Sequence, residues 1–449
     1  MDRTRLQQLL ARESAEAERR NPRSRAAYER AEHLFGRVPM TWMNKTAGAF
    51  PRYLDSARGA RVTDIDGHEY IDFCLGDTGA MAGHSPEVVA EAVRTRFAES
   101  GGATAMLPTE DAEWVGAELT RRFGLARWSF SLTATDANRW SIRLARAVTG
   151  RPKILVNSYS YHGSVDESLI VVGPDGHGTA RPGNVGAPCD VTLTSRVAEF
   201  NDLEQLEREL AHGDVAAVLM EPALTNIGIV LPEPGYLEGV RDLTRRYGTL
   251  LINDETHTFS AGPGGCTAAW NLEPDMLTIG KAIGGGIPAG AYGLSAELAD
   301  RLLGRDDLDL IDMGGVGGTL AGNALSTAAT RATLEHVLTD AAFDAMARLS
   351  ERFEAGVRAG IDAFGLPWSV SRLGARTEYR FADPAPRTGT ESAAAADTEL
   401  EDFLHLYLAN RGILLTPFHN MALMCPATTE QDVDRHTEVF AAALGELAG

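Results

Sequence analysis

The chain has 42 basic residues, and only three of them are lysines, Lys45, Lys153 and Lys281. Since arginine supplies positive charge everywhere else, a retained lysine points to chemistry that arginine cannot do. A lysine side chain can lose its proton and act as a nucleophile or a base, whereas a guanidinium group stays charged. The place of each lysine relative to the predicted strands therefore decides which of them could be catalytic.

Lys281 follows a strand-like run, residues 276–279, and enters a glycine-rich turn at residues 284–286. The preceding strand-like run, residues 250–253, leads directly into Asp254. Open α/β sheets bind their ligands at the carboxyl ends of the strands. A setting of apolar and glycine residues favours the uncharged amine that Schiff-base chemistry requires. The sequence thus predicts an acid and a nucleophilic amine at consecutive strand ends.

Residues 133–138, a run of small and hydroxyl residues, open a helix after the strand-like run 128–132. The free N–H groups and the dipole at a helix N-terminus both favour a phosphate. An ordinary threonine or aspartate N-cap explains the same residues, so both interpretations stay open. Tyr161, followed by His162 and Gly163, adds an aromatic ring after a further strand.

Together these residues fit the cofactor pyridoxal 5′-phosphate (PLP). Lys281 would form an imine with it, Asp254 would keep its pyridine nitrogen protonated, and Tyr161 would stack on its ring. The eleven histidines contain no HExxH motif, and no GxGxxG pattern follows a first strand. We therefore expect neither a metal centre nor a nicotinamide site.

Composition narrows the class of protein. The chain has 62 acidic residues against 42 basic ones and a formal charge of −20, which argues against nucleic-acid and anionic membrane surfaces. No run of eighteen residues is apolar, and the first twenty residues are charged throughout, so we expect no membrane span, no signal peptide and a cytoplasmic protein. The four cysteines show no CxxC spacing and are expected to be reduced thiols.

Alternating strand and helix patterns from about residue 127 must position these side chains. The predicted strands are residues 128–133, 153–157, 216–220, 250–253, 276–279 and 291–294. Short apolar strands that alternate with helices predict an α/β protein whose mostly parallel central sheet is flanked by helices. Beyond residue 324, helices followed by strand-like pieces predict a smaller α+β domain.

Several motifs, in order along the chain, resemble the class III (omega) aminotransferases of PLP fold type I, and within them the glutamate-1-semialdehyde aminomutase-like branch. The resemblance extends from about residue 25 to the C-terminus. The motifs are VTDIDGHEYIDF (62–73), GHSPEVVAEAV (83–93), ATDAN (134–138), SYHG (160–163), MEP (220–222) with Asn226, INDET (252–256), IGKAIGGGIPAG (279–290) and GGTLAGNAL (317–325).

The resemblance implies a division of the chain into three parts. Residues 1–64 would contribute to the small domain and the active site, residues 65–325 would form the large PLP-binding domain, and residues 326–449 the C-terminal small domain. The small domain would thus draw on both termini.

Carried over by position, the resemblance implies that Lys281 forms the internal aldimine and Asp254 pairs with the pyridinium nitrogen. Thr256 and Tyr161 would contact opposite faces of the ring, and Asn226 would hydrogen-bond its 3-oxygen. The other implied cofactor residues are Ala134 and Thr135 at the phosphate, Thr319 reaching the phosphate of the neighbouring subunit, and His162 and Glu221. Two chains would then build each site, so we expect a homodimer or a larger homo-oligomer.

The chain departs from the family pattern beside the expected ring. Family members usually have a hydrophobic residue in place of Thr256, and Ser-Gly-Thr-Glu in place of residues 133–136. His257 is also unusual. The simpler expectation for it is packing or a surface position, and the alternative is a residue that tunes the cofactor indirectly.

The expected substrate pocket also departs from the pattern. Residues 38–43 lack the arginine that binds a substrate carboxylate in several relatives, and residues 417–421 lack the acidic residue expected of the aminomutase. These differences argue against glutamate-1-semialdehyde and favour a hydrophobic or aromatic amine. The expected pocket residues are Trp42, Met43, Phe418, Met421 and Arg376, the last either for a keto-acid carboxylate or in a surface salt bridge.

We therefore expect a class III transaminase that moves an amino group from a primary amine or amino acid to a keto acid such as pyruvate, in two half-reactions through the Lys281 aldimine. An aminomutase, racemase or lyase is the nearest alternative, since all begin from the same adduct. A non-catalytic PLP-binding protein is the alternative of another class, and Lys281 with Asp254 argues against it.

Overall fold

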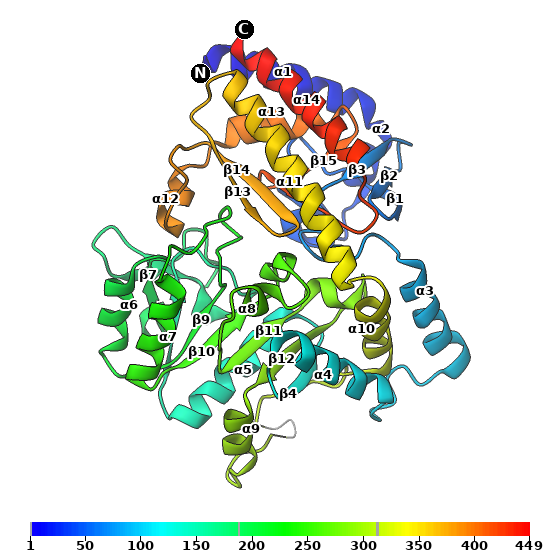
Figure 1. Cartoon of the computed structure of the whole chain (residues 1–449). Coiled ribbons are helices and arrows are strands. Elements are labelled where there is room, and N and C mark those ends of the chain that lie inside the picture. The colour runs from blue at the N-terminus through cyan, green and yellow to red at the C-terminus, as the bar shows by residue number, and fades with distance from the viewer. Residues whose placement is uncertain (1, 187–188, 311–313) are drawn as a thin grey trace. The chain divides into compact units, whose positions relative to one another are not determined.

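Two compact units make up the protein in a computed structural model that describes residues 2–186, 189–310 and 314–449. Unit 1 comprises residues 1–86, 344–385 and 395–449, and unit 2 comprises residues 87–343 and 386–394 (Figure 1). The chain therefore passes between the units after residues 86, 343, 385 and 394, whereas the predicted divisions lie after residues 64 and 325.

Helix packing explains where unit 2 begins and ends. Helix α3 (Glu87–Arg94) packs against α10 (Ala324–His336), and α10 packs against α4 (Glu110–Phe123). The ring of Phe343 lies edge-on to that of Phe259, with 5.3 Å between the ring centroids. Residues 326–343, just beyond the second predicted division, are thus part of the packing of unit 2, whereas residues 65–86, beyond the first, belong to unit 1.

A seven-stranded sheet forms the centre of unit 2, in the order β4-β12-β11-β10-β9-β5-β8. Its strands are β4 (Arg127–Ser131), β5 (Lys153–Asn157), β8 (Ser195–Ala198), β9 (Val215–Met220), β10 (Leu250–Asp254), β11 (Met276–Ile279) and β12 (Gly290–Leu294). Neighbours from β11 to β8 are parallel, and β12 runs antiparallel to both β11 and β4. The mostly parallel sheet is confirmed, with β8 as a strand that the sequence patterns did not predict.

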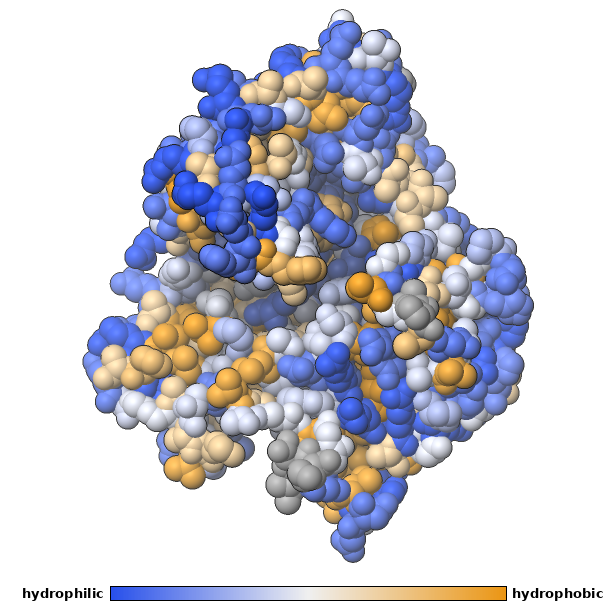
Figure 2. Space-filling model, turned by 180° about the vertical axis from the view of Figure 1, so that it is seen from behind, coloured by the Kyte–Doolittle hydropathy of each residue, from blue (hydrophilic) through white to orange (hydrophobic). Residues whose placement is uncertain are grey.

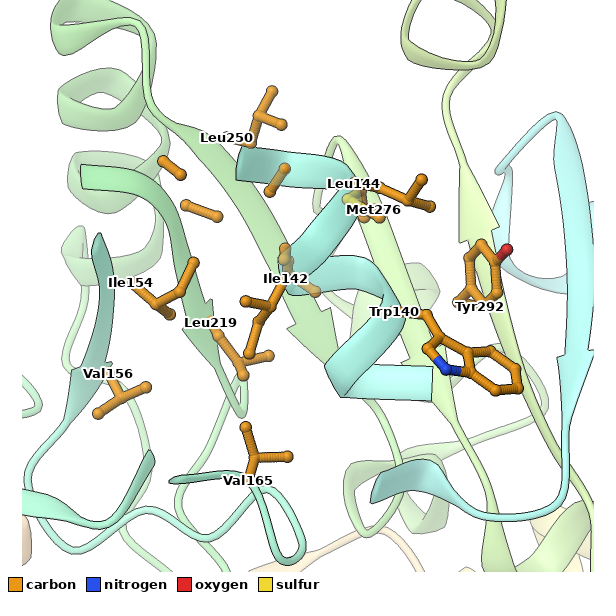
Figure 3. Close-up of a cluster of buried hydrophobic side chains, with 14 of the residues drawn as sticks. Trp140, Ile142, Leu144, Ile154, Val156, Val165, Leu219, Leu250, Met276 and Tyr292 are labelled. Atoms are coloured by element: carbon orange, nitrogen blue, oxygen red, sulfur yellow. The ribbon is translucent and has the colours of Figure 1, made fainter. Parts of the chain in front are cut away.

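Both faces of this sheet are covered, because successive side chains of its strands enter different hydrophobic clusters. Ile154 and Val156 of β5 pack with Ile142 on α5 (Ala134–Thr149), in the cluster that Figure 3 shows. Leu155 packs in a second cluster, with Val240 on α7 (Tyr236–Tyr247). This alternation is the period of two that a strand buried on both faces must have.

The remaining regular elements of unit 2 lie around the sheet. In the described residues they are η3 (Thr95–Ser100), η4 (Asp166–Ser168), β6 (Ile170–Val172), β7 (Gly178–Ala180), η5 (Val191–Leu193), α6 (Leu203–Leu210), η6 (Thr258–Ala261), α8 (Gly265–Ala269), η7 (Lys281–Gly284), α9 (Ala296–Leu303) and α12 (Gly389–Ala394).

Unit 1 is an α+β unit that contains both ends of the described chain (Figure 1). Its sheets have the orders β1-β2-β3-β15 and β13-β14-β16. Its strands are β1 (Leu54–Arg58), β2 (Arg61–Asp64), β3 (Glu69–Asp72), β13 (Ser369–Leu373), β14 (Arg376–Arg380), β15 (Ile413–Leu414) and β16 (Met421–Leu423). Its helices in the described residues are α1 (Arg3–Arg20), α2 (Pro22–Arg30), η1 (Phe35–Arg37), η2 (Thr41–Asn44), α13 (Thr398–Ala409), α14 (Glu430–Ala448) and most of α11 (Asp340–Ala363).

The surface is chemically mixed, and Figure 2 shows hydrophobic groups scattered among hydrophilic ones on one face. Within the described part of the chain, no helix combines the length and apolar character needed to cross a membrane.

The chain after β10 is anchored by the buried carboxylate of Glu255. This side chain is fully buried, and it accepts hydrogen bonds from Thr258 Oγ1 (2.5 Å), Thr267 Oγ1 (2.6 Å) and the backbone N–H groups of Cys266 and Thr267. Burial raises the pKa of Glu255 and outweighs these donors. The carboxylate thereby ties α8 to the end of β10.

Gly265→Ala is expected to lower the free energy of unfolding by about 2–4 kcal/mol. Gly265 has φ +59°, and a Cβ atom there would lie 2.3 Å from Glu255 Oε2. Gly262→Ala is the matched control, because Gly262 has extended backbone and open space around its Cβ position. The control is expected to change stability by less than about 0.5 kcal/mol in urea unfolding. Equal effects of the two substitutions would contradict the anchoring role.

Candidate active site

Asp254 and Lys281 lie at the same edge of the sheet because their strands are parallel neighbours. Asp254 ends β10 and is paired in register with Thr278 of β11, three residues before Lys281. Side chains at this edge leave the carboxyl ends of the strands, where α/β sheets bind ligands. The structure thus brings the two residues that the sequence singled out to adjacent positions in the fold.

Asp254 is held as a carboxylate by three neighbours. It is 3% exposed, and its Oδ2 accepts a hydrogen bond from Asn138 Nδ2 (2.8 Å) and lies 2.9 Å from His162 Nδ1. Its Oδ1 accepts from the backbone N–H of Thr256 (3.1 Å). Burial alone would raise the pKa of Asp254, but His162, Thr256 and Asn138 together lower it to about 2. The site therefore keeps a buried negative charge at neutral pH.

Asn138 is a site residue to which the sequence analysis gave no role. Its side chain is completely buried and also donates from Nδ2 to the carbonyl oxygen of His162 (3.1 Å). Its Oδ1 accepts from Thr278 Oγ1 (2.6 Å), so α5, β11 and the segment after β5 are joined around Asp254. The sequence could have indicated this role, because Asn138 is a polar amide on a helix whose other buried residues are small or apolar, and a buried amide needs hydrogen-bond partners.

The low pKa of Asp254 makes part of the stability depend on pH. Since the pKa in the folded protein is below the ordinary value of 3.8, the group stabilises the fold above about pH 4, and this contribution is lost as the pH falls towards 2. The full contribution is about 2 kcal/mol. We expect the difference in unfolding free energy between the wild-type protein and Asp254→Asn to shrink between pH 6 and pH 3 in urea titrations. A constant difference would contradict this.

Lys281 stands in a strained turn with its amine against a histidine. Its backbone φ is +50°, a left-handed conformation that is rare for a residue other than glycine, asparagine or aspartate. Its Nζ lies 2.6 Å from Nε2 of His257. His257 is 4% exposed, so it does not lie at the surface; it is packed in the interior, and its contact with Lys281 goes beyond packing.

Three backbone segments meet at the N-terminus of α5. A Cβ atom on Gly280 would lie 2.9 Å from the backbone nitrogen of Ala134, and one on Gly163 would lie 2.0 Å from Thr135 Oγ1. Thr135 Oγ1 also accepts from the backbone N–H of Ser164 (3.3 Å). Glycine thus allows a close approach that larger residues would block, as a cradle for a phosphate requires.

The capping interpretation of residues 133–138 is confirmed for two of them. Thr133 Oγ1 accepts from the backbone N–H of Asp136 (3.2 Å) and donates to its carboxylate (3.0 Å). The cap uses Thr133 and Asp136 and leaves Ala134 and Thr135, the two residues expected at the phosphate, beside Gly163 and Gly280.

The other expected cofactor residues also lie in unit 2. Two buried polar atoms, Asn226 Nδ2 and Thr256 Oγ1, have no hydrogen-bond partner in the described structure, and a polar ligand would supply one. Tyr161 is 40% exposed, and Glu221 accepts from Thr225 Oγ1. The buried carboxylate, the lysine, the glycine-lined helix start and these two atoms together suit the donor set that PLP requires.

Thr319 lies apart in the sequence from these residues, on an exposed segment of unit 2. It lines a pocket of about 320 Å³ together with residues 104–108 and 321–324. Met106 and Leu107 in this pocket are 78% and 73% exposed. The expected contact of Thr319 with a neighbouring subunit stays a prediction.

The five residues expected at the substrate all belong to unit 1. The rings of Trp42 and Phe418 meet edge-on, 6.5 Å apart, and Phe418 has φ +96°. Met43 is half-buried and Met421 is buried. Arg376 is only 1% exposed and donates to Thr78 Oγ1, so its alternative role in a surface salt bridge is wrong.

Comparisons with known proteins match this chain to the family that its sequence motifs resemble. Residues 42–444 match the family model described as aminotransferase class-III. A glutamate-1-semialdehyde-aminomutase from Pseudomonas aeruginosa PAO1, solved in complex with PMP, is 48% identical with a TM-score of 0.96, covering 100% of this chain and 99% of that chain. The glutamate-1-semialdehyde 2,1-aminomutase of Anaeromyxobacter dehalogenans is 33% identical over 95% of this chain and 98% of its own. An omega-transaminase from Sphaerobacter thermophilus is 31% identical, with a TM-score of 0.85 and coverage of 95% and 98%.

Proposed function

Because the chain belongs to the class III aminotransferases, PLP enzymes of fold type I, we propose that it transfers amino groups of small molecules with Lys281 and Asp254 as catalytic residues. The observation that carries this proposal is the pair of adjacent strand ends, one bearing a buried carboxylate and the other a lysine amine. The non-catalytic alternative does not account for either residue.

When it is bound, PLP supplies an electron sink for the negative charge that develops on the substrate carbon next to nitrogen. Asp254 would hold a proton on the pyridine nitrogen, which its charge at neutral pH favours. Lys281 Nζ would take a proton from the substrate carbon and return it to a neighbouring atom. Ala134 and Thr135 would bind the phosphate, and Asn226 and Thr256 would orient the ring with their buried polar atoms.

The course of the reaction is part of the proposal. The names of the relatives favour an aminomutase, in which amino group and acceptor belong to one molecule, over the transaminase that the sequence analysis preferred. We therefore take an aminomutase as the first candidate. It would need an amine-bearing substrate with a carbonyl group in the same molecule, and no second keto acid.

A transaminase is the second candidate, and the residues of unit 1 favour it. Trp42 and Phe418 form an aromatic pair with both rings more than 40% exposed, which suits an apolar amine. The transaminase from Sphaerobacter thermophilus has the same fold over nearly the whole chain. This candidate would take an amine and then a keto acid such as pyruvate.

Turnover with and without a keto acid distinguishes the two candidates. The holoenzyme would be given glutamate-1-semialdehyde alone, then a panel of hydrophobic and aromatic amines with and without pyruvate. Sustained isomerisation without a keto acid supports the aminomutase. One equivalent of pyridoxamine phosphate with an amine alone, and turnover only after pyruvate is added, supports the transaminase. Release of ammonia or loss of chirality without either result would indicate a lyase or a racemase.

The proposal includes a homodimer in the cytoplasm. The exposed apolar residues Met106 and Leu107 beside Thr319 support an interface at that segment, since apolar side chains of this size are usually covered. Analytical ultracentrifugation of the holoenzyme tests the oligomeric state.

A further inference from the structure

His257 and Lys281 are brought together by the two strands that also position Asp254. His257 lies three residues after the end of β10, and Lys281 two residues after the end of β11. Nε2 of the imidazole and Nζ of the lysine are 2.6 Å apart, which is hydrogen-bond distance. The histidine is 4% exposed, whereas the lysine is only half-buried. The more rigid partner of this pair is therefore the imidazole.

The backbone on both sides restricts where the pair can lie. Lys281 adopts a left-handed φ of +50°, a strained conformation that persists only where the surroundings impose it. Gly280 before it lies so close to Ala134 that a Cβ atom would meet the backbone nitrogen at 2.9 Å. His257 follows Glu255, whose buried carboxylate binds α8. Neither side chain reaches the other through a flexible loop.

We propose that His257 is a positioning residue for Lys281, whose amine it holds by a hydrogen bond whenever that amine is not bonded to the cofactor. A free lysine side chain has four rotatable bonds, and fixing its amine raises the rate at which it attacks a bound carbonyl. The inference rests on the proposed role of Lys281 as the cofactor-binding lysine. It gives His257 a role in the reaction beyond packing in the interior.

Packing alone does not explain the contact. A buried histidine that only packs needs no partner for Nε2 among catalytic groups, and an apolar side chain of similar size would serve equally well. His436 in unit 1 is such a case, since it stacks on Phe440 with no hydrogen-bond partner for either ring nitrogen. His257 differs because its Nε2 faces the one lysine at a strand end of this edge.

The chain offers an unusually clear test, because it contains only three lysines. Apo-protein would be treated briefly with acetic anhydride, digested, and analysed by mass spectrometry for acetylation of each lysine. Lys45 is exposed and Lys153 lies beside Asp214, so both serve as internal references in the same sample. In His257→Leu the released amine of Lys281 is expected to react about threefold to tenfold faster relative to these references.

Capture of PLP by the same apo-proteins is expected to change in the opposite direction. In His257→Leu the yellow band of protein-bound PLP should appear about tenfold more slowly in stopped-flow absorbance, because the amine is free but less well placed. His257→Gln keeps a polar group near the position of Nε2, so both of its rates are expected within about twofold of the wild-type values. A general structural defect would also alter the labelling of Lys153, which lies in the same unit and should react equally in all three proteins.

The outcomes separate this inference from the proposed function. If the wild-type protein captures PLP and Lys281→Ala does not, the role of Lys281 stands, and the three His257 proteins then decide the inference. Equal labelling and equal capture in His257→Leu and the wild-type protein overturn it, and so does a loss in His257→Gln as large as that in His257→Leu. Failure of the wild-type protein to capture PLP would overturn the proposed function itself.

Discussion

Replacement of Lys281 with alanine is expected to lower turnover by at least about 10³-fold, because in the proposed function one side chain acts both as nucleophile and as the group that moves the proton. The amine lies near a strand end, in a turn with positive φ and 2.6 Å from His257 Nε2, and no other lysine lies at this edge of the sheet in the described residues. Steady-state turnover and the absorbance of protein-bound PLP would be measured on the same preparation. Both are expected to fall together.

Lys153→Ala is the control for this substitution. Lys153 begins β5, where its amine lies 3.5 Å from Asp214 in a partly exposed pair. Loss of such a pair costs little, so its turnover is expected within about twofold of the wild-type value. Turnover above a tenth of the wild-type value in Lys281→Ala would contradict the assignment of the catalytic lysine.

Asp254→Asn is expected to lower turnover by about 10²–10³-fold, since it removes the fixed charge that in the proposed function would hold a proton on the pyridine nitrogen, and it keeps the size of the side chain. The wild-type carboxylate remains charged down to about pH 2 among His162, Asn138 and the N–H of Thr256. An amide can still accept some of these hydrogen bonds but cannot hold a proton on a pyridine nitrogen. Turnover at saturating substrate is the relevant measurement.

A control substitution at another aspartate shows whether the loss of any carboxylate charge would lower turnover. Asp214→Asn neutralises a partly exposed carboxylate that binds Arg196, and turnover is expected to change by less than about twofold. Thermal unfolding of both variants would show whether each protein is folded at the assay temperature. If a folded Asp254→Asn variant kept turnover within tenfold of the wild-type value, this would contradict the proposed catalytic role of Asp254.

The positions of Asp254 and Lys281 could be predicted because buried parallel strands appear in the sequence as short apolar runs. A residue that directly follows such a run must lie at the carboxyl edge of the sheet, whatever the loops around it do. Strand β8 was not predicted because it lies at the end of the strand order, where a strand need not be apolar throughout. Its residues 195–198 read Ser-Arg-Val-Ala, and half of them are polar.

Contacts between loops could not be predicted in the same way. The approach of His257 to Lys281 depends on the left-handed backbone at residue 281, which no local preference of lysine indicates. The role of Asn138 depends on residues from β11 and from the segment after β5 that are far away in the sequence. Patterns report which residues are buried, but the partner of a buried polar group is set by the tertiary fold.

The interleaved order of the two units has a consequence for the chain during its synthesis. Helix α1 buries Leu6 and Leu9 and packs on α13, although most of the protein separates these helices in sequence. At ribosomal rates of about 5–20 residues per second, roughly 20–75 s pass between the synthesis of α1 and the synthesis of α13. Throughout that time its apolar stripe is available to chaperones or to other nascent chains. Unit 1 is thus the later of the two units to bury its apolar side chains, and these stay exposed to aggregation for longer.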